Sequence, residues 1–429
     1  MLSSSVHHHL ARSLPPLHAA RRLFTNGRCL RYTEATQKVH EPTLERPKFA
    51  ERLGRPQIKN QILFFVFGSS LAFSYAAWRT NLETEAWATR LAASTKWTEI
   101  TSADLRRLQQ IDLVKNLRGS YTLIQDQASQ IPQLLRPWIS GLYLAFAQPY
   151  ADASDGRRLC WKLCLLNAGV WVAWNVSRLQ PMMIRSFMHH PLSGLSYTML
   201  TSTFSHRSII HLLANCLALE SFGSCHRNTH LSFAGSSAAV YLSQSQSSAS
   251  PDQLESTSAY HFLAFYLSAG IFASLVSHTV TVKFKYPRLI SRLSSPANAA
   301  KPVDTWQAAV SAVSNSAASA TRKAAASSIM PSLGASGAIY ACVTMTALAF
   351  PNGQIALTIP PSYPIDIQLG VGALLALDVL GVIRGWRFFD HFAHLGGAAF
   401  GVAYYTFGPT FWTYIRGAGG TKKSDQKEE

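Results

Sequence analysis

Seven apolar runs constrain this chain more than any other feature of its sequence. A helix needs about 20 mostly apolar residues to cross a bilayer. Seven stretches reach or approach that length: Ile62–Trp78, Leu159–Val176, Ile209–Phe222, His261–Val280, Gly337–Phe350, Leu369–Ile383 and Phe392–Phe407. Several are shorter or more polar than a lipid-facing helix, which favours helices buried in a bundle and lined with functional groups. We therefore expect an all-α, polytopic membrane protein.

The basic residues indicate targeting and topology. The net charge of +17 at pH 7 is accompanied by no nucleic-acid motif, so no nucleic-acid partner is expected. Glu34 is the first acidic residue, and the preceding stretch combines Ser, Leu and Ala with Arg12, Arg21, Arg22, Arg28 and Arg31. An Arg-rich, acid-free start is typical of a mitochondrial presequence, which we place at 1–33.

The rest of the chain divides by composition. Region 34–158 holds the first membrane segment at about 62–78 and a mixed linker, in which the apolar stretch Trp138–Ala147 is expected at the membrane interface. The core is predicted at 159–410 and a charged tail at 411–429. Two low-complexity stretches, Ser232–Ser258 and Ser291–Ser328, are predicted to be flexible loop insertions.

Loop charges predict which side each segment faces. When the seven segments are numbered zero to six, the loops after segments one, three and five are basic: Arg178 and Arg185, then Lys283, Lys285, Arg288, Arg292, Lys301, Arg322 and Lys323, then Arg384 and Arg387. The loop after segment four has no Lys or Arg, and the loop after segment two has only Arg227. By the positive-inside rule the odd-numbered loops face the matrix side.

The cysteines indicate no metal site. None of the six forms a CxxC pair, and Cys160 and Cys164 have no His or carboxylate partner at ligand spacing. Small buried residues or free thiols are the favoured interpretation, and no metal or other cofactor is predicted.

A serine stands among small residues at the start of segment four, in Gly334-Ala335-Ser336-Gly337-Ala338. Small neighbours let a peptide approach a serine hydroxyl, and a helix start offers free backbone N–H groups to an oxyanion. The alternative is close packing of membrane helices through small residues.

A histidine occupies segment six, in Ala393-His394-Leu395-Gly396-Gly397 followed by Gly401. Gly397 and Gly401 have GxxxG spacing, which would bring this segment against a small-residue face such as that around Ser336. His394 would then reach the Ser336 hydroxyl, as a general base must. The alternative is a packing motif whose histidine bonds a backbone carbonyl.

The third constellation is His206, His211 and Asn215 at the start of segment two. His211 and Asn215 are spaced i, i+4 and share one helix face, where both could donate hydrogen bonds to an oxyanion. Zinc is the rival ligand, but no HExxH or third strong ligand accompanies the pair. His206 is expected to cap or brace the loop.

Together these residues resemble the rhomboid family, whose signature is GxSG in the fourth core helix, AHxxGxxxG in the sixth and HxxxN in the second. The resemblance covers roughly Pro181 to Phe407. Residues 385–397, 202–206 and 331–338 look like the mitochondrial presenilin-associated rhomboid-like branch in particular. It implies a six-helix rhomboid core preceded by one extra N-terminal transmembrane helix (1+6). The loop Ser177–Thr203 lacks the Trp-Arg pair that some bacterial rhomboids carry there. Mitochondrial members of the family lack this pair too.

The resemblance also implies roles. Ser336 would be the nucleophile of a Ser-His dyad and His394 its base. The Ser336 N–H, His211 and Asn215 would form the oxyanion hole. Tyr340, one turn after Ser336, would either stack on the catalytic histidine or be a plain core aromatic. Neither Asp390 nor Asp378 occupies a catalytic position of the family, although an acid inside a membrane segment is a functional candidate by default.

The implied function is an intramembrane serine protease of the mitochondrial inner membrane, surrounded by lipid. Its substrates would be single-pass inner-membrane proteins, admitted past segment five, and its site would open towards the matrix side. One rival is an inactive rhomboid-like binder, but such members lose the serine or the histidine, and this chain keeps both. The other rival, a transporter, would predict discontinuous helices and paired repeats, which the sequence lacks.

Overall fold

The computed structural model describes residues 56–94, 99–220, 234–249, 253–293, 329–355 and 363–419. All of them belong to the larger of two compact units, Lys48–Glu429. The predicted presequence and nearly all of the second predicted insertion lie outside the described residues.

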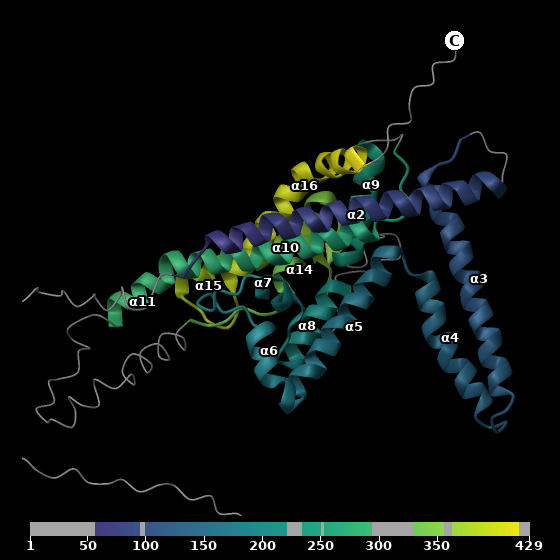
Figure 1. Ribbon diagram of the computed structural model, residues 1–429, viewed down its shortest axis with the longest axis horizontal. Coiled ribbons are helices and arrows are strands. Elements are labelled where there is room, and N and C mark those ends of the chain that lie inside the picture. Colours follow the sequence, from purple (N-terminus) through teal and green to yellow (C-terminus); the bar gives the residue numbers. More distant parts are fainter. Residues whose placement is uncertain are drawn as a thin grey trace, which may run out of the picture. The chain divides into compact units, whose positions relative to one another are not determined.

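Helices dominate the described part of the chain (Figure 1). The α-helices are α2 (Lys59–Ser94), α3 (Ser102–Ala128), α4 (Arg136–Asp152), α5 (Asp155–Asn175), α6 (Gln180–Ser186), α7 (Thr198–Thr201), α8 (Ile209–Glu220), α9 (Ala234–Ala249), α10 (Ala259–Val280), α11 (Tyr286–Leu293), α14 (Ser336–Ala349), α15 (Ile367–Arg384) and α16 (His391–Gly419). Short helical turns are η1 (Ser177–Leu179), η2 (Ser202–Phe204) and the π-helical η3 (Thr281–Lys285). Strands β1 (Gln354–Ile355) and β2 (Ile365–Asp366) pair antiparallel, and β2 directly precedes α15 in the sequence.

The prediction of a helical membrane bundle is confirmed. Within the described residues, three stretches are long and apolar enough to cross a membrane, namely α2, Ala259–Ser291 and α15. Helix α5 with Ser177–Ser186, bent by 93°, makes a fourth if the pair counts as one span. The other predicted segments also lie mostly in helices over their described residues, but the 1+6 arrangement stays a prediction.

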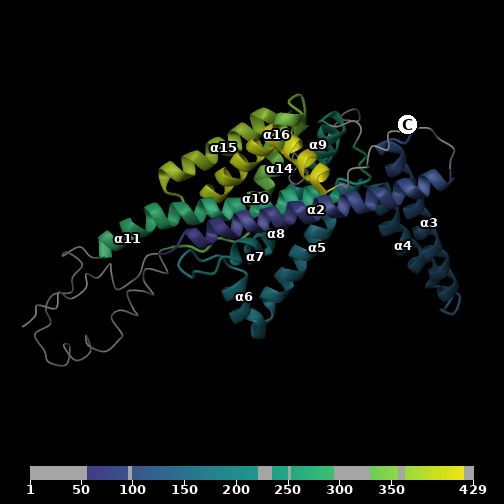
Figure 2. The same ribbon diagram turned by 45° about the horizontal axis from the view of Figure 1, so that its top comes forward.

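Helix α10 occupies the centre of the bundle. It packs against α2, α14 and α16, and Figures 1 and 2 both show α2 running alongside it. Its side chains are apolar around the whole circumference, so burial on all sides is the stable arrangement. Phe262, Phe265, Tyr266 and Ala269 are completely buried there.

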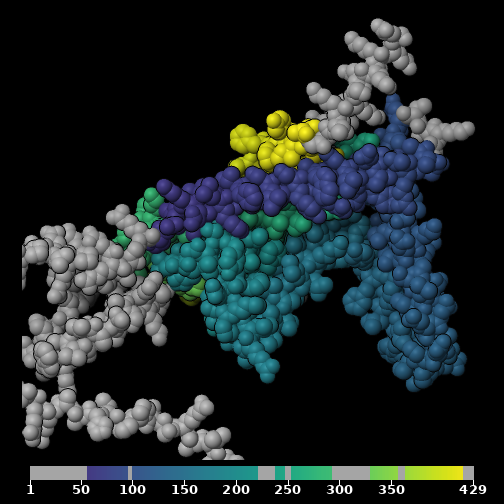
Figure 3. All heavy atoms as spheres, in the orientation of Figure 1, coloured from purple at the N-terminus to yellow at the C-terminus, as the bar shows by residue number. Residues whose placement is uncertain are grey.

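Helix α2 covers one face of the bundle, as the space-filling view in Figure 3 shows. One side of α2 buries Phe73, Ala76 and Ala77 against the core, whereas Leu63 and Phe67 on the other side are largely exposed. Such an apolar outer surface matches a helix that faces lipid.

Within the predicted flexible loop 232–258, residues 234–249 instead form helix α9. This helix packs on α14, α5 and α8 and fully buries Ala238 and Leu242. The segment that follows α9 in the sequence places Glu255 in a buried site. Small residues had suggested a loop, but alanine also favours a helix and permits close packing.

The predicted boundary between core and tail, after residue 410, falls inside helix α16. Helix α16 runs through the expected tail to Gly419 and completely buries Trp412. Arg416 is also buried, with its NH1 3.6 Å from Glu255 Oε2, and it donates to the backbone oxygen of Leu254. These contacts of the Arg416 guanidinium tie the end of α16 to the segment before α10.

Helices α3 and α4 form an antiparallel pair next to α2 (Figure 1). A capping box at Thr101 and Asp104 starts α3, since each side chain bonds the other's backbone N–H. Helix α4 contains the apolar stretch Trp138–Ala147 and buries none of its residues. Its expected interfacial position stays a prediction.

Candidate active site

Ser336 is the first residue of α14, and the loop before it is firmly held. Residue Ser332 forms a β-bridge with His189, through backbone bonds of 2.9 and 3.0 Å. Gly334 N donates to Ser202 O at 2.9 Å. Gly334 has a φ of 126°, a conformation that favours glycine. This turn allows the chain to enter α14 with Ser336 at the helix start.

His206 braces the same loop, as expected. Its Nε2 accepts a hydrogen bond from Ala335 N at 3.3 Å. Burial, reinforced by the neighbouring His211, lowers the pKa of His206 to about 4. The ring is therefore neutral at physiological pH and keeps the lone pair that this bond requires.

Glycines bring α16 against α14, as the GxxxG spacing predicted. A Cβ atom at Gly397 would collide with the backbone oxygen of Gly337, and one at Gly401 with that of Ala341. Only glycine permits this approach of two backbones, which sets the distance between the two helix starts.

That approach brings His394 onto Ser336. His394 Nε2 lies 2.8 Å from Ser336 Oγ, within hydrogen-bonding distance. The Tyr340 ring stacks on the His394 ring, with centroids 4.3 Å apart and planes inclined by 11°. The stacking geometry predicted as one of two options for Tyr340 is therefore present. A neutral imidazole in this position can accept the serine proton.

His211 and Asn215 differ in their position relative to the cavity at Ser336. The His211 ring contacts Gly334, and both His211 and Ser336 line the same cavity. Asn215 is outside the lining of that cavity, and its Nδ2 donates to the His211 backbone oxygen at 2.8 Å. The structure thus brings His211 close to the serine, while the Asn215 amide is engaged within α8.

Asp378, which the sequence marked as a functional candidate without a role, and His391, which it did not single out, lie on the other side of His394. Asp378 Oδ1 on α15 lies 3.0 Å from His394 Nδ1 and 2.6 Å from His391 Nδ1. All three side chains are buried. The available signal was the spacing of His391 three residues before His394, which places both on one face of α16.

Asp390 has a different position from Asp378. Its Oδ1 accepts from Ala393 N at 3.2 Å, at the start of α16. Its Oδ2 accepts from Ser277 Oγ on α10 at 2.6 Å. Asp390 therefore caps α16 and ties it to α10, without contacting the reacting groups.

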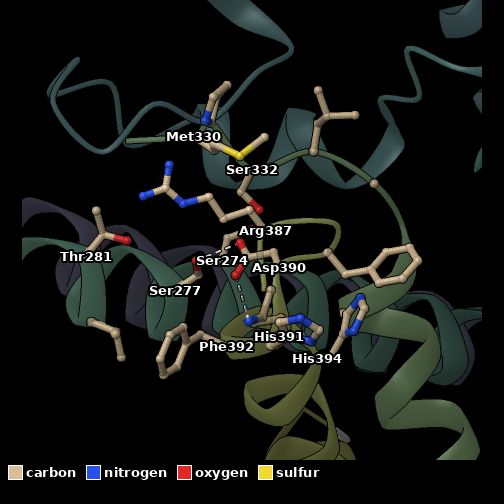
Figure 4. A pocket seen from close by; sticks show the side chains of 18 of the residues that line it. Ser274, Ser277, Thr281, Met330, Ser332, Arg387, Asp390, His391, Phe392 and His394 are labelled. Carbon is tan, nitrogen blue, oxygen red and sulfur yellow. Dashed lines mark hydrogen bonds between the residues drawn. The ribbon is translucent and has the colours of Figure 1, made fainter. Parts of the chain in front are cut away.

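A cavity of about 960 Å³ opens over Ser336 and His394. Its walls come from α10, η3, α15, the start of α16 and the loop 329–334. Figure 4 shows His391 and His394 side by side at its base, with Asp390 and Ser277 next to them. The lining mixes aromatic residues with the cations Arg207, Lys285, Arg288 and Arg387. A cavity of this size admits an extended peptide segment together with water.

The cluster of Asp378, His391 and His394 contains metal-ligand residue types. Their potential ligand atoms all lie within 4.8 Å of one another. Those same atoms are already joined by the two hydrogen bonds to Asp378 Oδ1. These two hydrogen bonds account for the short distances between Asp378 and the two imidazole rings.

A family model supports the resemblance that the motifs suggested. Residues 305–409, which include Ser336, Asp378 and His394, match the model described as a rhomboid domain. No solved structure matches the chain.

Curated relatives extend the match. The chain is 32% identical over 258 residues to the mitochondrial presenilin-associated rhomboid-like proteins of Bos taurus and Homo sapiens, which is 60% of this chain and 50% of each relative. It is 26% identical over 253 residues to the mitochondrial rhomboid protein 1 of Saccharomyces cerevisiae, 58% of this chain and 52% of that protein. The chain thus spans about half the length of the curated relatives it matches. The resemblance to the rhomboid family is confirmed over residues 305–409, and these relatives are named as mitochondrial rhomboid proteins.

Proposed function

We propose that this chain, which carries a rhomboid domain, is an intramembrane serine protease of the mitochondrial inner membrane. The observation that carries the proposal is the 2.8 Å contact between His394 Nε2 and Ser336 Oγ at the starts of two packed helices. The apolar helices, the rhomboid match and the mitochondrial relatives support the membrane, the protease class and the organelle.

The proposed reaction uses a Ser-His dyad. Ser336 Oγ adds to the scissile carbonyl carbon while its proton moves to His394 Nε2, and the carbonyl electron pair becomes an oxyanion. Collapse of this intermediate breaks the C–N bond, and the departing amine takes the proton from His394. Water then adds to the acyl-enzyme with His394 again as base, which releases the acid product and restores Ser336.

The oxyanion would form beside the start of α14. Ser336 is the first residue of that helix, where backbone N–H groups have no partner in the preceding turn. His211, packed on Gly334, supplies a ring N–H from the other side. Asn215 gives one amide N–H to the His211 backbone oxygen and keeps a second for the oxyanion or a bridging water.

We infer that the substrates are single-pass membrane proteins, cleaved in or near their membrane segment. Helix α15 supplies part of the cavity wall, and its outer surface exposes Leu369, Leu377 and Ile383. A substrate helix that leaves the lipid beside α15 would reach the cavity without crossing the buried core. This fits the gate position that the rhomboid resemblance implies for segment five.

Reconstitution tests the proposed activity. Wild type and Ser336→Ala are placed in vesicles with a single-helix substrate, and cleavage is measured over time. Only the wild type is expected to cleave, whereas a binder without protease activity would leave the substrate intact in both. Equal cleavage by the two proteins would refute the assignment to Ser336.

The loop charges further suggest that the site opens towards the matrix. Arg207 is exposed and lines the cavity, so Arg207→Cys places a thiol at its entrance. A membrane-impermeant maleimide should add label to this variant, relative to wild type, in inverted inner-membrane vesicles and not in mitoplasts. The reverse pattern would place the opening on the intermembrane-space side.

A further inference from the structure

The carboxylate of Asp378 lies where it can control the catalytic histidine. We propose that Asp378 is a positioning residue for His394, an inference that rests on the proposed protease function. Its Oδ1 is 3.0 Å from His394 Nδ1, and on the opposite side of the ring Nε2 is 2.8 Å from Ser336 Oγ. The three side chains form a continuous line from the α15 carboxylate through the imidazole to the α14 hydroxyl.

This line fixes the tautomer of His394. A carboxylate accepts hydrogen bonds, so the proton of a neutral His394 ring resides on Nδ1 when it pairs with Asp378. Nε2 then presents its lone pair to the Ser336 hydroxyl, as a general base must. Without the carboxylate, the contact between Nε2 and the Ser336 hydroxyl would be compatible with a proton on either ring nitrogen of His394.

The charge of Asp378 is directed at the histidines. Asp378 is buried, and the Tyr340 hydroxyl is the other polar group beside its carboxylate. Its Oδ1 receives both imidazole contacts. When His394 becomes an imidazolium during attack by Ser336, the positive charge forms next to this anion. Attraction between the two is strong in a poorly solvated site, so it stabilises the transition state.

His391 holds the carboxylate in place. Its Nδ1 lies 2.6 Å from the same oxygen, and its ring packs on Gly381, three residues after Asp378 on α15. A Cβ atom at Gly381 would collide with this ring. His391 therefore orients Oδ1 towards α16, where His394 is within reach. A purely structural His391–Asp378 pair is the competing explanation, and it would not require the contact with His394.

No proton needs to leave the imidazole towards Asp378. The Ser336 proton moves to Nε2, the Nδ1 proton stays on the ring, and Asp378 remains ionised throughout. The step therefore needs no reactant beyond those of the proposed hydrolysis.

Kinetics of the full chain in vesicles test the role. Asp378→Asn keeps the shape and removes the charge, so kcat should fall about 10²-fold or more, with KM changed by less than about twofold. Asp378→Glu keeps the charge and should retain more activity than Asp378→Asn. The matched control is Asp366→Asn, an exposed acid at the start of the same helix. It should cleave like wild type.

Two outcomes would overturn the role of Asp378. One is an Asp378→Asn enzyme with a kcat within about twofold of wild type. The other is higher activity in Asp378→Asn than in Asp378→Glu, which would mean that shape matters and charge does not. Both are judged in preparations where Ser336→Ala is inactive. Cleavage by Ser336→Ala would instead refute the proposed function.

A second measurement does not depend on cleavage by any variant. ¹⁵N NMR of the wild-type chain in micelles, with the His394 signals identified by their loss in His394→Gln, reports the tautomer without substrate. A proton on Nδ1 supports the positioning role. A ring protonated on Nε2 alone overturns it.

Discussion

At the residue scale, the shape of the loop before Ser336 depends on Gly334. Its φ of 126° strains any other residue, by about 1–3 kcal/mol. A Cβ atom there would also lie 2.7 Å from His211 Cε1. Gly334→Ala should therefore lower both the melting temperature and the cleavage rate, the latter by at least about tenfold if His211 supplies an oxyanion hydrogen bond.

Gly194→Ala separates the two causes. Gly194 also has a positive φ, of 72°, but a Cβ atom there would meet nothing within 4 Å. This variant should lose stability and keep its cleavage rate. If Gly334→Ala cleaves as fast as Gly194→Ala, contact with His211 does not matter for catalysis.

Tyr340 offers a second residue-scale prediction. Its ring lies flat on His394 at 4.3 Å, and such ring pairs contribute about 0.5–1.5 kcal/mol beyond their burial. Tyr340→Phe keeps the stacked ring and removes only the hydroxyl beside Asp378, so its kcat should fall less than that of Tyr340→Ala. Tyr340→Ala should lower kcat about two- to tenfold through a less ordered His394. Cleavage kinetics of both variants measure this, and a wild-type kcat in Tyr340→Ala would contradict it.

The sequence predicted the catalytic residues that lie in short local motifs. Ser336 and His394 stand in short motifs whose glycines also predict how their helices meet. The contact of Asp378 with His394 could not be predicted in this way, because it depends on how α15 crosses α16. Asn215 shows that even a local pattern leaves side-chain bonds undetermined. Helical spacing predicted that it shares a face with His211, but not that its amide donates to the His211 backbone oxygen.

At the scale of elements, the contact between α14 and α16 sets the catalytic distance. A Cβ atom at Gly397 would collide with a backbone oxygen of α14, and a backbone atom cannot rotate away. Gly397→Ala should therefore push the helices apart, separate His394 from Ser336 and abolish cleavage. The melting temperature should fall as well, because the packing of the bundle is lost.

Gly417→Ala is the control in the same helix. A Cβ atom there would meet nothing within 4 Å, so alanine should leave cleavage unchanged and stabilise α16 by up to about 1 kcal/mol. Melting curves and cleavage rates of both variants decide the matter. Wild-type behaviour of Gly397→Ala would mean that the helices have room to adjust.

Helix α9 shows why one element was predicted wrongly. Its Ser, Gln and Ala residues have the composition of a linker, yet Ala238 and Leu242 fit into the bundle beside α14. In a membrane protein, small residues also serve close packing, so composition alone does not separate a linker from a packed helix.

At the scale of the whole molecule, apolar runs predicted the helical bundle but not the polar contacts at the end of α16. The sequence predicted a charged tail at 411–429. Arg416 is instead buried, bonded to Asn81 Oδ1 at 2.9 Å and close to Glu255. These contacts join α2, α16 and the segment before α10, three parts that are distant in the sequence. Their partners could not be inferred from a local pattern.

Glu255 makes this junction sensitive to pH. Burial raises the pKa of Glu255 from 4.5 to about 7, against the opposing effect of the Arg416 guanidinium. Between those values the folded protein binds a proton that the unfolded chain has released. The contribution to stability is therefore fully present below pH 4.5 and is lost as the pH rises through about 7.

Glu255→Gln removes this titration and retains the side-chain shape. From pH 5 to pH 8, the free energy of unfolding of wild type should fall by about 2–3 kcal/mol relative to the variant. Unfolding of both proteins in micelles at the two pH values measures the difference. The control is Asp112→Asn, since Asp112 pairs with the exposed Arg90 at 3.7 Å in a partly exposed position and should leave the pH dependence of wild type unchanged. If wild type and Glu255→Gln respond equally to pH, the junction is not titrated through Glu255, and the stability of the bundle over this range is set by other groups.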